Sequence, residues 1–209
     1  MKLAIFDWNG TLCNDRDITY FGVVKIFNYF QITPPSAKTY FREITADYMP
    51  FYYQHGIPET ASTQKLNEIW TDHFKNHSVG PTLHKGATSL LFSLKRNWWR
   101  LAIVSAQTEA LLSHQIKNLG LSDCFDFIRG DSKNKKIALA ETLQQLEVKA
   151  EKTFYVDDND KGIQDANGLG IHTIGFGGGW QSTKQIKAAK PKFFVDQLEK
   201  INSIAKQLE

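Results

Sequence analysis

Leu3-Ala4-Ile5-Phe6-Asp7-Trp8-Asn9-Gly10-Thr11-Leu12 is the stretch that decides the fold of this 209-residue chain. Its apolar residues predict a buried β-strand, which ends on Asp7 and then breaks at Asn9-Gly10. A buried carboxylate is unfavourable unless its charge is offset, so an Asp at the carboxyl end of a strand favours a chemical role over a packing role. Asp7 is therefore a candidate nucleophile.

Asp7-Trp8-Asn9-Gly10-Thr11 resembles the first motif of the haloacid dehalogenase-like hydrolases, in which Asp-x-Asp-Gly-Thr ends the first core strand. The resemblance implies that Asp7 attacks phosphorus and forms an aspartyl-phosphate. In that family the second Asp of the motif protonates the leaving group and then activates water, but this chain has Asn9 there. A carboxamide cannot shuttle a proton near neutral pH, so one chemical role is removed while the shape is kept.

Short apolar runs alternate with helix-like stretches along the chain, which predicts an α/β fold with a Rossmann-like parallel sheet covered on both faces. The expected strands are 3–8, 101–105, 125–129, 153–157, 172–176 and 193–195, and the expected helices between them are 109–119 and 136–146. Ligands bind beyond the carboxyl ends of such strands, so we expect the residues at these ends to converge.

The interval between the first two strands is long and is typical of three or four helices, including 18–30, one after Pro34-Pro35, and 61–77. We therefore expect an α/β core of residues 1–14 and 80–209 and a helical domain of residues 15–79. In the resembling family, such an insertion is an α-helical cap that closes over the site and selects the substrate. The aromatic run 47–55 is then a candidate either for substrate contact or for the cap's own core.

The end of the second strand is at the place of another family motif, where a Ser or Thr hydrogen-bonds a phosphoryl oxygen. The resemblance makes Thr11, Ser105 and Ala106 the expected substrate-binding residues, with backbone amides helping to hold the oxygens. A helix cap is the alternative interpretation of Ser105.

Lys133 is at the place of the family's lysine, which neutralises the nucleophile and the phosphate. Lys135 and Lys136 compete for this role, because the register of the cluster is approximate. A solvated loop is the alternative interpretation of all three. With this lysine, the expected catalytic residues are Asp7, Asn9 and Lys133.

Asp157-Asp158 follows the fourth strand, and two adjacent carboxylates are most easily maintained beside a divalent cation. Magnesium is the expected ion, with Asp7, the backbone carbonyl of Asn9, and Asp157 or Asp158 among its ligands. The family often has a further Asp about four residues beyond the pair, where this chain has Gly162. Which carboxylate touches the metal therefore stays open, and a capping pair is the alternative.

Composition narrows the function classes. Two cysteines, Cys13 and Cys124, do not suggest a disulfide scaffold or a metal cluster, which favours a reducing, cytoplasmic setting. No apolar run has the length of a signal peptide or a membrane span, so we expect a soluble protein without a membrane partner. A net charge of +3, with dispersed basic residues, does not indicate nucleic-acid binding.

The whole pattern predicts a magnesium-dependent phosphatase of a small phosphorylated metabolite, similar to the phosphoglycolate phosphatase group and acting as a monomer or a homodimer. Two alternatives stay open. One is a hydrolase of C–P or C–halogen bonds from the same superfamily, whose C–P members use a cap lysine for which Lys25, Lys38 and Lys65 are the nominal candidates. The other is a phosphate-binding protein that no longer turns over. Both alternatives arise because Asn9 replaces the second Asp of the family motif.

Overall fold

A computed structural model describes residues 1–77 and 80–208 of the chain. Its centre is a six-stranded parallel sheet of order β5-β4-β1-β6-β7-β8, so the first strand of the chain lies in the middle. The strands of this sheet are β1 Lys2–Phe6, β4 Trp99–Val104, β5 Phe127–Arg129, β6 Thr153–Asp157, β7 His172–Phe176 and β8 Phe193–Val195. The predicted α/β fold and its six strands are confirmed.

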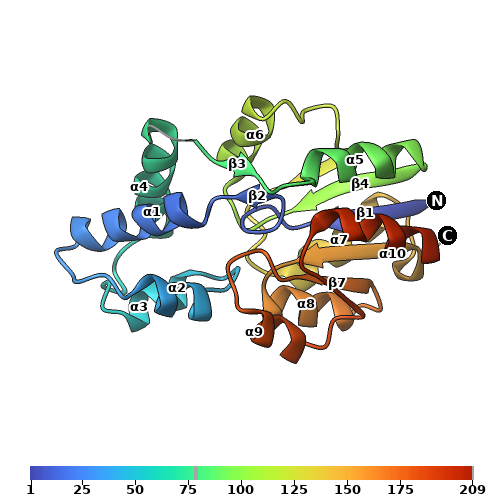
Figure 1. Cartoon of the computed structure of the whole chain (residues 1–209). Helices are drawn as coiled ribbons and strands as arrows, with labels where there is room; N and C mark the ends of the chain where they lie inside the picture. Colours follow the sequence, from blue (N-terminus) through green and yellow to red (C-terminus); the bar gives the residue numbers. More distant parts are fainter. Residues whose placement is uncertain (78–79, 209) are drawn as a thin grey trace.

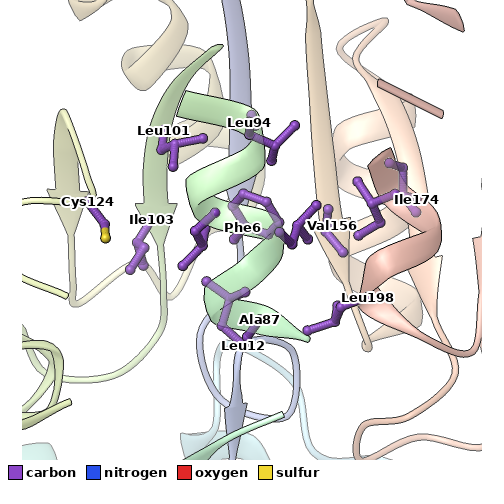
Figure 2. Close-up of a cluster of buried hydrophobic side chains, with 14 of the residues drawn as sticks. Phe6, Leu12, Ala87, Leu94, Leu101, Ile103, Cys124, Val156, Ile174 and Leu198 are labelled. Atoms are coloured by element: carbon purple, nitrogen blue, oxygen red, sulfur yellow. The ribbon is translucent and has the colours of Figure 1, made fainter. Parts of the chain in front are cut away.

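The side chains of β1 alternate between two apolar cores, because successive residues of a strand point to opposite faces of the sheet. Ala4 and Phe6 face one core, and Leu3 and Ile5 face the other. Figure 2 shows the first core, in which Phe6 lies among the side chains of the neighbouring strands and of the helix that covers them. All four β1 residues are fully buried, so the strand that leads to Asp7 is firmly held.

Helices cover both faces of the sheet. The core around Phe6 is closed by α5 Ala87–Arg96, α6 Glu109–Asn118 and α10 Ile201–Gln207, and the opposite core by α7 Lys135–Gln145 and α8 Asp160–Asn167. Of these five helices, the sequence predicted only α6 and α7. The other short helical elements near the sheet are α9 Thr183–Ala188 and the 3₁₀ turns η1 Ala150–Lys152 and η2 Leu198–Lys200.

The predicted helical insertion is present and contains α1 Arg16–Tyr29, α2 Ala37–Glu43, α3 Met49–Gln54 and α4 Thr63–Asn76. Serine side chains cap two of these helices: Ser36 accepts from the backbone of Thr39 in α2, and Ser62 from that of Lys65 in α4. The four helices share an apolar core of their own, which includes Phe27, Tyr40 and Tyr52. Figure 1 shows them at one end of the sheet, opposite both chain termini.

The chain passes between the insertion and the sheet at two places that lie side by side. Here β2 Cys13–Asn14 and β3 Thr82–Leu83 form a short antiparallel ribbon. The backbone N–H of His84 adds a hydrogen bond of 2.9 Å to the carbonyl of Leu12. The predicted boundary at residue 79 lies outside the described residues, so the limits of the two domains stay a prediction.

Two tryptophans mark a difference from the predicted start of the second core strand at residue 101. The strand begins at Trp99, which is buried, whereas Trp98 is 87% exposed and has a positive φ of 61°. Trp99 packs against Phe154 across the sheet, and this apolar contact extends the strand. Cys13 and Cys124 are both buried and free. No helix in the described ranges is long and apolar enough to cross a membrane.

Candidate active site

The carboxyl ends of the three central strands converge, as predicted. Asp7 directly follows β1, while Ser105 follows β4 and Asp157 ends β6 on either side of it. Together they line a depression that we call the acidic pocket. Its lining residues are Asp7, Asn9, Ile44, Thr45, Ala46, Ser105, Ala106, Lys135, Asp157, Asp158, Asn159, Gly162 and Trp180.

Lys135 is the lysine beside Asp7, which corrects the sequence-based preference for Lys133. The Lys135 ammonium is buried, donates to Asp7 Oδ1 at 2.5 Å and also donates to the backbone carbonyl of Val104. Asn134 caps α7 by accepting from the N–H of Ile137, so the helix begins at Lys135 and directs this side chain back to the strand ends. Lys133 lies outside the helix, with its ammonium 4.8 Å from the centroid of the Tyr48 ring.

Three carboxylates share the acidic pocket: Asp7, Asp157 and Asp158 each place an oxygen within 4.8 Å of the others. Burial and the nearby Asp7 carboxylate raise the pKa of Asp157 to about 7. Burial, reinforced by Asp157, raises the pKa of Asp158 well above its usual range. The single lysine does not balance three carboxylates, so this oxygen-rich donor set fits a divalent cation.

Each member of the aspartate pair is held in place by hydrogen bonds. Asp157 accepts from the Tyr155 hydroxyl at 2.6 Å and from the N–H of Asn159 at 2.9 Å. Asp158 accepts from the Thr11 hydroxyl at 2.8 Å and from the N–H of Trp180 at 2.5 Å. Such supporting contacts fix the direction of carboxylate oxygens before a ligand arrives.

Thr11 does not have the position of a substrate-binding residue, in contrast to the sequence-based expectation. It is fully buried and does not line the acidic pocket. Its hydroxyl donates to Asp158 Oδ1 and accepts from the Asp158 N–H at 3.1 Å, so both of its hydrogen-bonding roles serve Asp158. The positive φ of Gly10 turns the chain so that this pairing can form.

Ser105 and Ala106 lie where the sequence predicted them, on the wall of the acidic pocket. The Ser105 hydroxyl accepts a hydrogen bond of 3.1 Å from the N–H of Gln107 and retains its own proton to donate. The N-cap of the following helix is Thr108, so Ser105 supports a turn and does not cap α6. Its position is therefore compatible with contact to a substrate oxygen.

Asp15 contacts the site through Asn9, and the sequence-based reasoning missed it. Its carboxylate is buried and accepts from the Asn9 side-chain amide at 2.5 Å, the N–H of Gly10 at 3.1 Å and the Trp180 indole at 3.1 Å. Burial raises the pKa of Asp15 to about 6. The chain thus has an amide at position 9 and a buried acid in contact with it. Its location just before the first helix of the insertion is the only sequence signal that pointed to it.

Gly162 allows α8 to approach the site closely. A methyl group on its Cα would lie 1.9 Å from Asp157 Oδ2. We expect Gly162→Ala to displace Asp157 and to weaken binding of an activating metal about 10- to 100-fold, as for other changes that disturb ligand orientation. The measurement is the metal concentration needed for half-maximal activity. Gly168→Ala at the end of the same helix is the matched control, because its added methyl would meet nothing closer than 3.5 Å. Equal metal requirements in the two variants would contradict this prediction.

A second pocket adjoins the acidic one and shares Asn9, Ile44, Thr45, Ala106 and Trp180 with it. We call it the aromatic pocket. The rest of its lining consists of Ile26, Tyr40, Tyr48, Tyr52, Leu66, Asn67, Trp70, Gln107 and Thr108.

The residues of the aromatic run 47–55 divide between the two roles foreseen for them. Tyr48 and Tyr52 line the aromatic pocket, whereas Phe51 is buried in the core of the insertion. His55 pairs with Glu43 at 3.0 Å and is not part of the acidic cluster. The lysines considered for C–P cleavage, Lys25, Lys38 and Lys65, line neither of the two pockets.

The sequence profile of a family described as haloacid dehalogenase-like hydrolase matches residues 4–176. No curated protein matches the chain. Among solved structures, a predicted phosphatase from Clostridium acetobutylicum has a TM-score of 0.85 at 18% identity, covering 99% of this chain and 98% of that one. A predicted phosphoglycolate phosphatase from Haemophilus somnus has a TM-score of 0.80 at 16% identity, with 98% and 97% covered. A β-phosphoglucomutase from Clostridium difficile has a TM-score of 0.76 at 18% identity, with 100% and 97% covered. At these identities the likeness shows a common fold.

Proposed function

The chain belongs to the haloacid dehalogenase-like hydrolase family, and on that premise we propose that it is a magnesium-dependent hydrolase of small phosphate monoesters that forms an aspartyl-phosphate on Asp7. The observation that carries the proposal is the cluster of Asp7, Asp157 and Asp158 around a single buried lysine at the strand ends. The similar structures named as phosphatases support the choice of phosphate esters among the substrates open to the family.

The first step is in-line attack of an Asp7 carboxylate oxygen on phosphorus, which breaks the P–O bond to the leaving group and forms an acyl phosphate. The leaving oxygen departs with the electron pair of that bond and takes its proton from water. Lys135 offsets the negative charge that accumulates, and Ser105 with the backbone at Ala106 holds the phosphoryl oxygens. Asp7, the Asn9 carbonyl and Asp157 or Asp158 would hold magnesium, which would supply further positive charge when bound. Water then hydrolyses the acyl phosphate and regenerates Asp7.

Asn9 cannot protonate the leaving alcohol, so the native chain is expected to act best on esters with good leaving groups. In the same proposal, residues 15–79 form a cap whose inner face supplies much of the aromatic pocket. Substrates would then be bound between the cap and the strand ends, with the phosphate in the acidic pocket.

Phosphate release from a panel of small phosphate monoesters, with magnesium or with EDTA, tests the proposal. We expect release that requires the metal. No release from any ester, together with thermal stabilisation by inorganic phosphate and magnesium, would favour the alternative of a phosphate-binding protein without turnover. The Asn9 side chain is the observation that keeps this alternative in the test.

The assignment of the site lysine gives a separate prediction. We expect Lys135→Met to reduce kcat by at least about 10²-fold, because a buried charge aimed at the reacting centre is lost. Lys136→Met is the matched control, since Lys136 is the next residue and is exposed. Steady-state kinetics on one ester measure both variants, with circular dichroism to confirm folding. A loss in the Lys136 variant and not in the Lys135 variant would overturn the assignment.

A further inference from the structure

The aromatic pocket adjoins the acidic pocket, so under the proposed function it offers space for the part of the substrate that leaves with the ester oxygen. Five residues line both pockets, so the two are continuous. Apolar and aromatic side chains dominate its wall, among them Tyr40, Tyr52, Trp70 and Trp180. Such a surface favours a flat or apolar group over a strongly hydrated one.

Charge is the second feature of this wall. Among the lining residues in the described part of the chain, none carries a charged side chain. A substrate carboxylate placed there would be desolvated without a counter-charge, which is unfavourable. Lys133, whose ammonium lies over the Tyr48 ring, is not a lining residue. Lys135 is already paired with Asp7.

The polar groups of Gln107 and Thr108 in this wall are used within the protein or are closed off from the pocket. Gln107 accepts through Oε1 from the Trp70 indole at 3.1 Å and from the N–H of Thr108 at 3.2 Å, so its side-chain amide is held in one direction. Its buried Nε2, and the buried hydroxyl of Thr108, have no hydrogen-bond partner within residues 1–77 and 80–208. A buried donor without a partner is unfavourable. Both atoms have almost no accessible surface, so they lie behind the wall of the pocket and give a charged substrate group no partner.

We propose that the substrate is a phosphate monoester whose leaving group is uncharged and flat or aromatic, and that short carboxylate-bearing esters such as phosphoglycolate are disfavoured. This inference rests on the proposed phosphatase function. The nature of the leaving group follows from the side chains that line the aromatic pocket, whereas the reaction itself is assigned to the acidic pocket.

The test compares benzyl phosphate, phosphoglycolate and glycerol phosphate with magnesium. All three release an alkyl alcohol, so differences in kcat/KM report recognition more than the intrinsic reactivity of an aryl ester. We expect kcat/KM for benzyl phosphate to exceed that for phosphoglycolate about tenfold or more, because the carboxylate is not compensated. The opposite ranking, with a preference for phosphoglycolate that Lys133→Met removes, would overturn the inference and leave the phosphatase function standing. Failure of these three esters and also of aryl esters, which have better leaving groups, to release phosphate would reject the proposed function itself.

A variant that adds a positive charge to the aromatic pocket tests the same preference directly. Thr45 lines both pockets and is exposed, so a longer side chain there does not disturb the apolar core. We expect Thr45→Lys to raise kcat/KM for phosphoglycolate relative to benzyl phosphate by about tenfold, since it supplies the missing counter-charge. Thr45→Met has a similar length without the charge and should not change the ranking. No difference between these two variants would show that charge in the aromatic pocket does not decide the leaving group.

Discussion

Asp7→Asn is expected to reduce phosphate release by at least about 10⁴-fold, because an amide cannot replace a carboxylate as the attacking group. The substitution keeps the size of the side chain and its place after β1. It should therefore remove the chemistry without removing the site. Phosphate release with magnesium measures the loss, and mass spectrometry of acid-quenched protein should detect the covalent adduct in the native chain alone.

Stability and activity should respond differently to this substitution. Asp7 contributes to the repulsion that raises the pKa values of Asp157 and Asp158, and the neutral amide of the variant would relieve it. Loss of the pairing with Lys135 opposes that gain, although Lys135 keeps its hydrogen bond to Val104. We therefore expect a change in Tm within about 4 °C, corresponding to about 1 kcal/mol for a chain of this size.

A carboxylate at the opposite edge of the sheet provides the control. Asp126 precedes β5, accepts from the N–H of Leu101 at 2.8 Å and lies 3.8 Å from the Arg100 guanidinium. Asp126→Asn should leave phosphate release unchanged even if it lowers Tm. Native-like release by the Asp7→Asn variant, with its folding confirmed, would mean that another group attacks phosphorus.

The sheet could be predicted from the sequence because its signal is local. Runs such as Thr153–Asp157 are apolar, short and bounded by polar residues, and this strand is observed with the predicted bounds. Helix α8 could not be recognised in this way. It has eight residues, and Ile163 and Ala166 are its only buried side chains besides Gly162. Its position depends on packing against the sheet, which no local pattern records.

Single residues of the site could likewise be predicted only where the local sequence pattern places them. Asp7, Ser105 and Asp157 could be placed because each follows or ends an apolar strand. The choice among Lys133, Lys135 and Lys136 depends on where α7 begins, and the Asn134 cap decides it in the structure. Asp15 becomes visible as a site residue only when the turn at Gly10 folds it back onto Asn9.

Exchange of the acid and the amide at positions 9 and 15 is expected to have the second large effect. Asn9→Asp alone would place a carboxylate about where the Asn9 amide now donates to Asp15 Oδ2, at 2.5 Å. Two buried carboxylates this close must share a proton or separate, so the single variant is expected to gain less activity than the restored motif allows.

The double variant Asn9→Asp/Asp15→Asn removes this conflict. An amide at position 15 could accept through Oδ1 from Gly10 and Trp180, as Asp15 does now, and donate through Nδ2 to the new carboxylate. Position 9 would then carry the acid that protonates the leaving alcohol and activates water. We expect kcat for alkyl esters to rise about 10²- to 10⁴-fold over the native chain, the range typical of general acid–base catalysis.

The single variant Asp15→Asn completes a double-mutant cycle. It separates the effect of the exchange on stability from its effect on catalysis. It would place an amide N–H₂ against the Asn9 amide N–H₂, so one donor loses its partner and unfolding should become about 1–3 kcal/mol easier. The double variant should recover this loss, which gives a coupling free energy that denaturant titration measures.

Intact-mass analysis must confirm that the native protein retains Asn9, because deamidation before Gly10 would create the acid. If the double variant recovers stability and gains no activity with any alkyl ester, proton transfer at position 9 does not limit this enzyme, and a group from the insertion or from the substrate must supply the proton.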